Sequence, residues 1–315
     1  MSVVIRVPAT TANLGPGFDT LGVALSLHNV FRVEPALHTS ILGCEEKYRG
    51  SDNLFLRAMR YASGLLGEPA PEVHLEIAAD IPLARGLGSS AAMIAGGVAA
   101  AVLLQAERPG RLAFDAGERQ FILDAAAAME GHPDNAASAV FGGFCASIAL
   151  SPDTKKPDEP PKILCSRSDV VSGWVFHALI PPFELSTMEA RAALPAVLPR
   201  ADAVFNLGRA ALVALAFEKK DAGILSAACE DKIHQQYRKA LIPGYGEVTD
   251  ACRKAGATAV WLSGAGPTIL ALTTEEPISS FFADAIAPVL GERNEGPWKH
   301  LVLSADSEGV GYIYE

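Results

Sequence analysis

Apolar and polar positions alternate along some stretches of this chain and recur every three to four residues along others, which predicts a mixture of strands and helices. Val73-His74-Leu75-Glu76-Ile77 alternates strictly, as a strand with one buried face does. Residues 91–104 are continuously apolar and rich in alanine, which favours a buried helix. The predicted strands cover 3–7, 23–34, 73–78, 143–150, 174–180, 258–262, 268–273, 299–304 and 310–314. The predicted helices cover 53–66, 90–106, 115–130, 135–141, 187–195, 201–217, 221–232, 244–255 and 278–290.

The order of these elements indicates the fold class. Strands and helices mix without the strict alternation of a doubly wound sheet, so we expect an α+β fold in two parts. Residues 151–161 are mostly prolines and charged residues, which cannot continue a helix or a strand. We therefore predict an N-terminal domain over residues 1–165 and a C-terminal domain over residues 166–315.

Composition narrows the expected partners. Half of the 315 residues are hydrophobic and the formal net charge is −10 without a basic run, which disfavours nucleic acid and anionic membranes. The 5 cysteines are scattered and form no C-x-x-C pair, which favours reduced thiols over disulfides or a zinc site. The apolar run 91–104 is too short to span a bilayer, and the first residues lack the apolar segment of a signal peptide. We expect a cytoplasmic protein whose partner is a small molecule.

A glycine-rich turn, residues 82–92, joins the predicted strand at 73–78 to the buried helix. Gly86 and Gly88 allow the backbone to approach a ligand, and Ser89 or Ser90 can cap the helix. Backbone N–H groups at a helix N-terminus bind anions, so this turn favours phosphate binding. It differs from the common phosphate loop because no Gly-Lys-Ser/Thr follows.

Two other interpretations of this turn remain. Residues 86–91 also satisfy the dinucleotide pattern G-x-G-x-x-A, which needs a strand running directly into the first glycine and an acid at the end of a second strand. Here residues 82–85 intervene, and Glu107, at the right distance, lies in a predicted helix end and turn. The context therefore disfavours a dinucleotide. The other interpretation is a plain helix entry whose small residues permit close packing.

Two further glycine-rich segments, 7–19 and 262–270, are predicted tight turns of small polar residues between apolar strands. Together with residues 82–92 they are similar, in order, to the three motifs of the GHMP kinase family. Within that family the chain most resembles the members that act on L-homoserine. The residues that carry this closer similarity are His132, Pro133, Asp134, Asn135, Leu185, Ser186, Thr187, Arg191, Glu230, Asp231, His234, Gln235 and Arg238.

The resemblance implies a fold and an activity. It implies a ribosomal-S5-domain-2-like N-terminal domain that binds ATP and a ferredoxin-like C-terminal domain, with the site between them. The implied reaction is the ATP- and Mg²⁺-dependent phosphorylation of the side-chain hydroxyl of L-homoserine, a step towards threonine. The implied ATP contacts are Pro82, Leu83, Ala84, Arg85, Gly86, Leu87, Gly88, Ser89, Ser90, Ala91, Ala92, Asn53, Ser263 and Gly264. The implied acceptor contacts are Asn13, Asp19, Asn135, Arg191 and Arg238, and the implied catalytic residues are Asn135, Asp124, Ser90 and Thr187.

The chemistry of the acceptor agrees with these assignments. Homoserine is a zwitterion with a primary hydroxyl, so its pocket needs an anion for the ammonium and cations for the carboxylate. The resemblance places Asp19 against the ammonium, and Arg191 and Arg238 against the carboxylate. Arginine suits a carboxylate because its planar fork can donate two parallel hydrogen bonds. A sugar or mevalonate would not require all three residues.

Several roles stay open at this level. Ser90 and Asp124 are the expected Mg²⁺ ligands, but the family has a glutamate at the position of Asp124, so Glu130 is a second candidate. Asn135 cannot accept a proton at neutral pH, so it would orient the hydroxyl, and it could instead cap the next helix. The γ-phosphate or solvent would then take the proton. Asn53 is either an adenosine contact or a helix cap.

Other functions are weighed beside this one. Within the kinases, the main competitor is an enzyme for another small amino alcohol. A member that binds ligand without catalysis is favoured only by Asp124 and by Ala84, where the relatives often have serine. Tight binding of a nicotinamide cofactor would revive the oxidoreductase interpretation. A homodimer is left open.

Overall fold

The computed structural model describes residues 2–105, 113–151, 160–274, 278–291 and 294–315. Glu107 and most of the predicted connection at 151–161 lie outside these ranges. Within them the chain forms two sheets with helices packed beside them, so the predicted α+β fold in two parts is confirmed. Among the described helices, none combines the length and the hydropathy needed to cross a membrane.

The first sheet is built mainly from the N-terminal half. Its central path is β11-β1-β2-β4-β3; β5 pairs with β2, and β6 pairs with β5. Among the described strand pairs of this sheet, β3–β4 alone is parallel. The strands are β1 (Val3–Ala12), β2 (Leu21–Pro35), β3 (Ser40–Leu42), β4 (Val73–Ala79), β5 (Phe144–Ala149), β6 (Ile163–Ser168) and β11 (Gly311–Tyr314).

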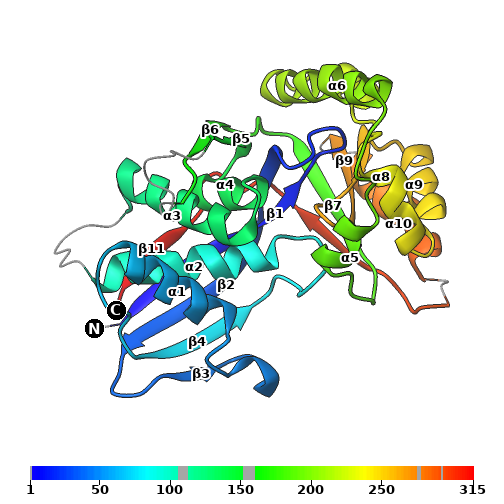
Figure 1. The fold of residues 1–315 in the computed structure, drawn as a ribbon. Coiled ribbons are helices and arrows are strands. Elements are labelled where there is room, and N and C mark those ends of the chain that lie inside the picture. The colour runs from blue at the N-terminus through cyan, green and yellow to red at the C-terminus, as the bar shows by residue number, and fades with distance from the viewer. Residues whose placement is uncertain (1, 106–112, 152–159, 275–277, 292–293) are drawn as a thin grey trace.

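Four helices pack together beside this sheet (Figure 1). They are α1 (Leu54–Leu65), α2 (Ser89–Leu104), α3 (Ala116–Glu130) and α4 (Asp134–Phe141); the short 3₁₀ helix η1 (Glu46–Tyr48) precedes α1. Helix α2 is apolar on all its faces because it contacts β1, β2 and the other three helices. Its small residues permit these close contacts: a Cβ at Gly97 would collide with the backbone of α1.

The second sheet has the order β10-β7-β9-β8, and all its pairs are antiparallel. Numbered along the chain, its strands therefore run 4-1-3-2, with helices between the first and second and between the third and fourth, as in ferredoxin-like folds. The strands are β7 (Trp174–Ile180), β8 (Ala259–Leu262), β9 (Ile269–Thr274) and β10 (Lys299–Leu303). The helices are α5 (Thr187–Ala192), α6 (Arg200–Lys219), α7 (Ala222–Ala228), α8 (Gln235–Arg238), η2 (Lys239–Leu241), α9 (Tyr245–Lys254) and α10 (Ile278–Gly291).

The structure differs from the predicted elements in several places. The short elements β3, β6 and α8 were not predicted, and the helix predicted at 221–232 ends at Ala228. It ends there because the Asp231 carboxylate accepts hydrogen bonds from the backbone N–H groups of Ile233, His234 and Gln235 and holds a turn. The last strand of the chain, β11, pairs with β1 in the first sheet. The domain division at residue 165 stays a proposal.

The three glycine-rich segments meet where the two sheets adjoin. The backbone N–H of Thr10 donates to the carbonyl of Leu87 (3.1 Å), and that of Gly264 donates to the carbonyl of Ala12 (3.2 Å). The Ser263 hydroxyl donates to the Gly86 carbonyl (2.6 Å). Turns whose bonded residues lie 77 to 252 positions apart in the chain are thereby fixed against one another.

Candidate functional site

A cavity of about 810 Å³ opens at this junction. It is lined by residues of β2 and β4 in the first sheet, by α5 and Arg238 beside the second sheet, and by residues of all three glycine-rich segments. The predicted site residues that line it are Asn13, Asp19, Asn53, Pro82, Leu83, Ala84, Arg85, Gly86, Gly88, Ser89, Ser90, Ala91, Asn135, Thr187, Arg191, Arg238 and Gly264. Leu87, Ala92, Asp124 and Ser263 lie outside this set. The structure thus brings most of the predicted residues together.

One wall of the cavity is the turn that leads into α2. Gly86 and Gly88 have φ angles of +74° and +71°, and a Cβ on either would collide with Ser263 or Thr10. Glycine is therefore required at both positions. The buried Ser89 hydroxyl at the start of α2 has no hydrogen-bond partner within the described chain. The N-terminus of this 16-residue helix and that hydroxyl together can bind a phosphate group.

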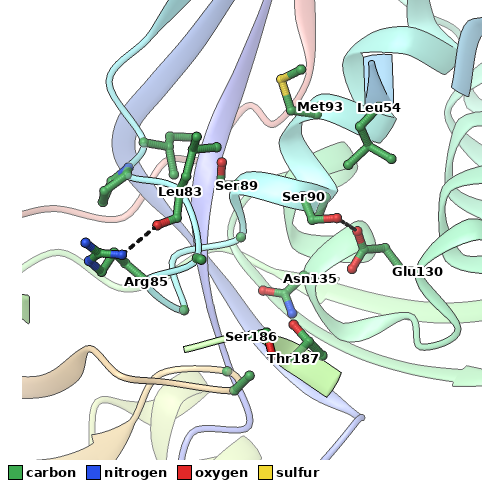
Figure 2. A pocket seen from close by; sticks show the side chains of 18 of the residues that line it. Leu54, Leu83, Arg85, Ser89, Ser90, Met93, Glu130, Asn135, Ser186 and Thr187 are labelled. Carbon is green, nitrogen blue, oxygen red and sulfur yellow. Dashed lines mark hydrogen bonds between the residues drawn. The ribbon is translucent and has the colours of Figure 1, made fainter. Parts of the chain in front are cut away.

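Ser90 and Glu130 meet at the edge of the same wall (Figure 2). The Ser90 hydroxyl donates a short hydrogen bond to Glu130 Oε1, which reaches it from the C-terminal end of α3. Burial raises the pKa of the Glu130 carboxyl above its ordinary value. A hydroxyl and a carboxylate oxygen side by side form the kind of donor pair that Mg²⁺ prefers.

Asp124, an expected metal ligand, occupies a different environment, outside the residues that line the cavity. Its Oδ1 accepts hydrogen bonds from the backbone N–H of Ile163 (2.8 Å) and from Gln120 Nε2 (2.8 Å). The carboxylate therefore ties α3 to β6. Glu130, the second candidate, is the carboxylate of α3 that lines the cavity.

The opposite end of the cavity carries the charged side chains that are expected to bind the acceptor. Arg191 donates from Nη2 to Asp19 Oδ1 (2.8 Å) and from Nη1 to Asp19 Oδ2 (3.1 Å). Arg191 belongs to α5, which is started by a capping box between Ser186 and Glu189. Asp19 is held by its backbone N–H, which donates to Asn13 Oδ1 (3.0 Å).

Arg238 approaches the same end from below the surface and is 1% exposed. Its Nε donates to the Ala190 carbonyl (3.1 Å), and its Nη1 donates to the Gly264 carbonyl (3.1 Å). Nη1 also contacts His234 Nδ1 (3.3 Å), while His234 Nε2 donates to a backbone carbonyl. Burial lowers the pKa of Arg238 to about 10, so its positive charge persists at neutral pH. The Phe18 ring lies 5.2 Å from this guanidinium, measured to the ring centroid.

Asn135 and Thr187 also line the cavity and lie near each other in Figure 2. Asn135 Oδ1 accepts a hydrogen bond from the Thr10 hydroxyl (2.7 Å), and its Nδ2 donates to Asp134 Oδ1 (3.2 Å). Asn135 is the second residue of α4, so its alternative assignment as a helix cap is wrong. Asn53, in contrast, does cap α1, and its oxygen accepts from two backbone N–H groups.

Arg85 lines the cavity, but its guanidinium points to the C-terminal half. It donates from Nε to the Pro181 carbonyl (3.1 Å), from Nη2 to the Pro182 carbonyl (2.9 Å) and from Nη1 to the Leu83 carbonyl (3.1 Å). The last of these bonds is drawn in Figure 2. The side chain therefore fastens the phosphate-binding turn to the segment that leads from β7 to α5.

Two further features of the site were not predicted from the sequence. Asp19, His132 and Asp134 place ligand atoms within 4.8 Å of one another, but His132 Nδ1 bonds Asp134 Oδ1 (2.6 Å) and Asp19 bonds Arg191. Burial lowers the pKa of His132, and the Asp134 carboxylate more than offsets this, so the pKa is raised. Asn29, on β2, is buried and lines the cavity with an Nδ2 that has no partner in the described structure. A lone asparagine in a strand carries no sequence signal that could have revealed it.

Comparison with known proteins decides the family. The model of the GHMP kinase N-terminal domain matches residues 53–143, and that of the GHMP kinase C-terminal domain matches residues 212–287. The chain belongs to the GHMP kinase family. These matches include the phosphate-binding turn, Glu130 and Asn135.

Relatives of this GHMP kinase resemble it over nearly its whole length. A homoserine kinase of Clostridium botulinum (strain Langeland / NCTC 10281 / Type F) is 41% identical over 309 residues, which cover 98% of this chain and 97% of that protein. A homoserine kinase of Picosynechococcus sp. (strain ATCC 27264 / PCC 7002 / PR-6) is 40% identical and covers 87% and 88%. The crystal structure of homoserine kinase from Cytophaga hutchinsonii superposes with a TM-score of 0.83 at 25% identity, covering 99% of this chain and 97% of that one.

Proposed function

We propose that this GHMP kinase transfers the γ-phosphoryl group of ATP to the side-chain hydroxyl of L-homoserine, giving O-phospho-L-homoserine for threonine synthesis in the cytoplasm. The observation that carries the proposal is one continuous cavity with a phosphate-binding turn at one end and the Asp19–Arg191 pair at the other. The names of the relatives support the same substrate.

ATP fits the end of the cavity formed by residues 86–90. Backbone N–H groups at the start of α2 and the free Ser89 hydroxyl would bind the phosphates, and the helix dipole favours their negative charge. The base would lie towards Asn29 and Asn53, which line the same cavity farther along β2 and α1. Asn29 Nδ2 is available there to donate a hydrogen bond.

Ser90 and Glu130 fit a magnesium ion, because hard cations bind oxygen donors and both oxygens face the phosphate end. When bound, the ion would neutralise the charge that develops on the phosphates during transfer. The protein contributes the carboxylate and hydroxyl that hold the ion in place.

The acceptor fits the other end. Asp19 would bind the ammonium, and Arg191 with Arg238 would bind the carboxylate. Asn135 and Thr187 would orient the hydroxyl towards the phosphate end. Since an asparagine does not accept a proton at neutral pH, the proton of the hydroxyl would pass to an oxygen of the transferred phosphoryl group or to solvent. Positioning and charge neutralisation then account for the catalysis.

An acceptor panel tests the proposal. With MgATP, we expect ADP release in proportion to added L-homoserine and little release with galactose, mevalonate, 3-aminopropanol or 4-hydroxybutanoate. Phosphorus NMR should show one new phosphomonoester on the acceptor. Equal turnover on 3-aminopropanol would move the assignment to another amino alcohol. A protein that binds ATP and homoserine without turnover would be a non-catalytic member.

A further inference from the structure

His234 is a fully buried titratable side chain that has no part in the reaction proposed above. It precedes helix α8, is 0% exposed and lies outside the residues that line the cavity. Burying a polar side chain costs free energy unless its polar atoms are hydrogen-bonded. Both ring nitrogens of His234 have a partner, and both partners belong to the acceptor end of the cavity.

These partners fix the protonation of the imidazole. Nδ1 lies 3.3 Å from Arg238 Nη1, and a guanidinium can only donate, so Nδ1 is the unprotonated acceptor. Nε2 lies 2.9 Å from the Gly15 carbonyl oxygen, which can only accept, so Nε2 carries the proton. Burial lowers the pKa of His234 and the Arg238 charge lowers it further, while the carboxylates of Asp231 and Asp19 offset only part of the shift. The ring is therefore neutral at neutral pH and serves both partners at once.

The bond from Nε2 acts on the anion of the acceptor end. Gly15 lies in the turn 13–19, which ends at Asp19. Phe18, the neighbour of Asp19, stacks on the imidazole with ring centroids 5.3 Å apart and an angle of 27° between the planes. His234 therefore contacts this turn twice, once through its proton and once through its face.

The imidazole is itself held in a fixed place. The backbone N–H of His234 donates to Asp231 Oδ2 (2.9 Å), and Asp231 Oδ1 accepts from Asn206 Nδ2 (2.7 Å). The same Asn206 nitrogen donates to the Pro16 carbonyl of the turn (3.1 Å). Buried hydrogen-bond networks of this kind are rigid when every member has its partners. A ring that is held in this way can set the distance between the groups on its two sides.

We infer that His234 is a positioning residue for the acceptor: Nε2 holds the turn that carries Asp19, Nδ1 holds Arg238, and the ring thereby fixes the spacing between the anion and the cation. The inference rests on the proposed function, because such a spacing matters only for an acceptor that carries both charges. Arg238 also donates to the carbonyls of Ala190 and Gly264. Loss of the imidazole bond therefore leaves the cation in the site and releases its position.

Two variants separate the two bonds. His234→Asn can place its amide oxygen near the position of Nδ1, so it keeps an acceptor for Arg238 and loses the donor to Gly15. His234→Gln can place its amide nitrogen near the position of Nε2, so it keeps the donor and loses the acceptor. Each should raise KM for homoserine about tenfold. The value of kcat should stay within about threefold and ATP affinity should be unchanged, because the phosphate end is untouched.

Selectivity distinguishes positioning from a merely structural role. His234→Asn should lower the ratio of kcat/KM for homoserine to kcat/KM for 4-hydroxybutanoate, because the side that binds the ammonium is loosened. His234→Gln should lower the ratio of kcat/KM for homoserine to kcat/KM for 3-aminopropanol, because the side that binds the carboxylate is loosened. His177→Gln is the matched control, since His177 is also 0% exposed and hydrogen-bonded but lies outside the cavity lining. It should lower stability and leave both ratios unchanged.

A measurement on the wild type does not depend on how well the variants fold. The nitrogen NMR shifts of the imidazole, with His234 assigned through its contact with the Phe18 ring, should show the neutral Nε2–H tautomer at neutral pH. A protonated ring or the Nδ1–H tautomer overturns the inference, because neither can accept from Arg238. Variants that turn over homoserine with both selectivity ratios unchanged also overturn it. A wild type that does not phosphorylate homoserine overturns the proposed function and the inference with it.

Discussion

Asp19 and Arg191 form a two-point ion pair across the cavity, with N–O distances of 2.8 Å and 3.1 Å. Asp19 comes from the turn between β1 and β2, and Arg191 comes from α5 beside the second sheet. Their side chains are 33% and 38% exposed, so a ligand can reach both. A zwitterionic acceptor can replace this ion pair with two others. Its ammonium group would pair with the Asp19 carboxylate, and its carboxylate would pair with the Arg191 guanidinium. The pair therefore presents the two charges that the proposed substrate needs.

Substitution of either member should reduce the use of homoserine. Asp19→Asn keeps the shape and removes the anion, and Arg191→Ala removes a cation. Because truncating one partner of a hydrogen-bonded charge pair costs roughly 2–5 kcal/mol, kcat/KM for homoserine should fall about thirty- to several-thousandfold. Steady-state kinetics measures this loss. ATP affinity, measured by calorimetric titration, should change little.

The two variants should also differ in selectivity. Asp19→Asn should lower the ratio of kcat/KM for homoserine to kcat/KM for 4-hydroxybutanoate, which lacks the amino group. Arg191→Ala should narrow the preference over 3-aminopropanol, which lacks the carboxylate. Arg253→Ala is a suitable control, because Arg253 is exposed and pairs with the nearby Asp250. If neither preference changed, these residues would not bind the acceptor.

Much of this pocket could be predicted from the sequence because the motifs are local. A glycine-rich turn at the start of a helix presents backbone N–H groups to an anion wherever it lies in a fold. Gly86 and Gly88 were therefore sufficient to indicate a phosphate-binding turn. The Asp19–Arg191 contact joins residues 172 positions apart, so their spacing alone carried no information about their distance. Only the family resemblance placed both at the acceptor.

Asp124 shows what spacing along the chain leaves open. It lies six residues before Glu130 on the same helix, so the two side chains point about 120° apart. Spacing along the chain cannot tell which face of α3 meets the phosphate-binding turn. The structure shows that Glu130 does, while Asp124 accepts the backbone N–H of Ile163 in β6.

These two carboxylates should therefore give opposite phenotypes. Glu130→Gln should lower kcat about a hundred- to a thousandfold, as the loss of one charge-stabilising group commonly does, with little loss of stability. Asp124→Ala should leave kcat within a few fold and lower the free energy of unfolding by about 1–3 kcal/mol, because the buried N–H of Ile163 loses its acceptor. Kinetics with MgATP and urea denaturation separate the two effects. The reverse pattern would restore Asp124 as the metal ligand.

His177 should make the second sheet sensitive to acid. Its ring is fully buried, Nδ1 contacts His300 Nε2 (3.0 Å) and Nε2 contacts the Thr273 hydroxyl (3.0 Å). Burial, aided by His300, lowers the pKa of His177 to about 4 from 6.5. Below pH 6.5 the unfolded chain binds a proton that the folded chain does not, so stability is full above this pH and decreases towards pH 4.

Urea midpoints measured across this range check the prediction. His177→Gln should flatten the decrease between pH 6.5 and about 4, although it lowers stability at neutral pH. His38→Gln is the matched control, because His38 is an exposed histidine outside the second sheet. An equally steep decrease in His177→Gln would assign the acid sensitivity to other groups.

Arg85 should link the two ends of the cavity, although it belongs to the phosphate-binding turn. Its guanidinium holds the carbonyls of Pro181 and Pro182, a few residues before α5 and Arg191. Loss of these charge-assisted bonds should loosen α5, so Arg85→Ala should raise KM for homoserine roughly tenfold, more than it weakens ATP binding. Arg85→Lys should not restore the wild-type KM, because one ammonium cannot reproduce the fork that spans both carbonyls. Kinetics at saturating ATP, together with ATP titration, measures the two effects separately. A variant that lost ATP affinity and kept its KM for homoserine would instead show that Arg85 acts on the phosphates.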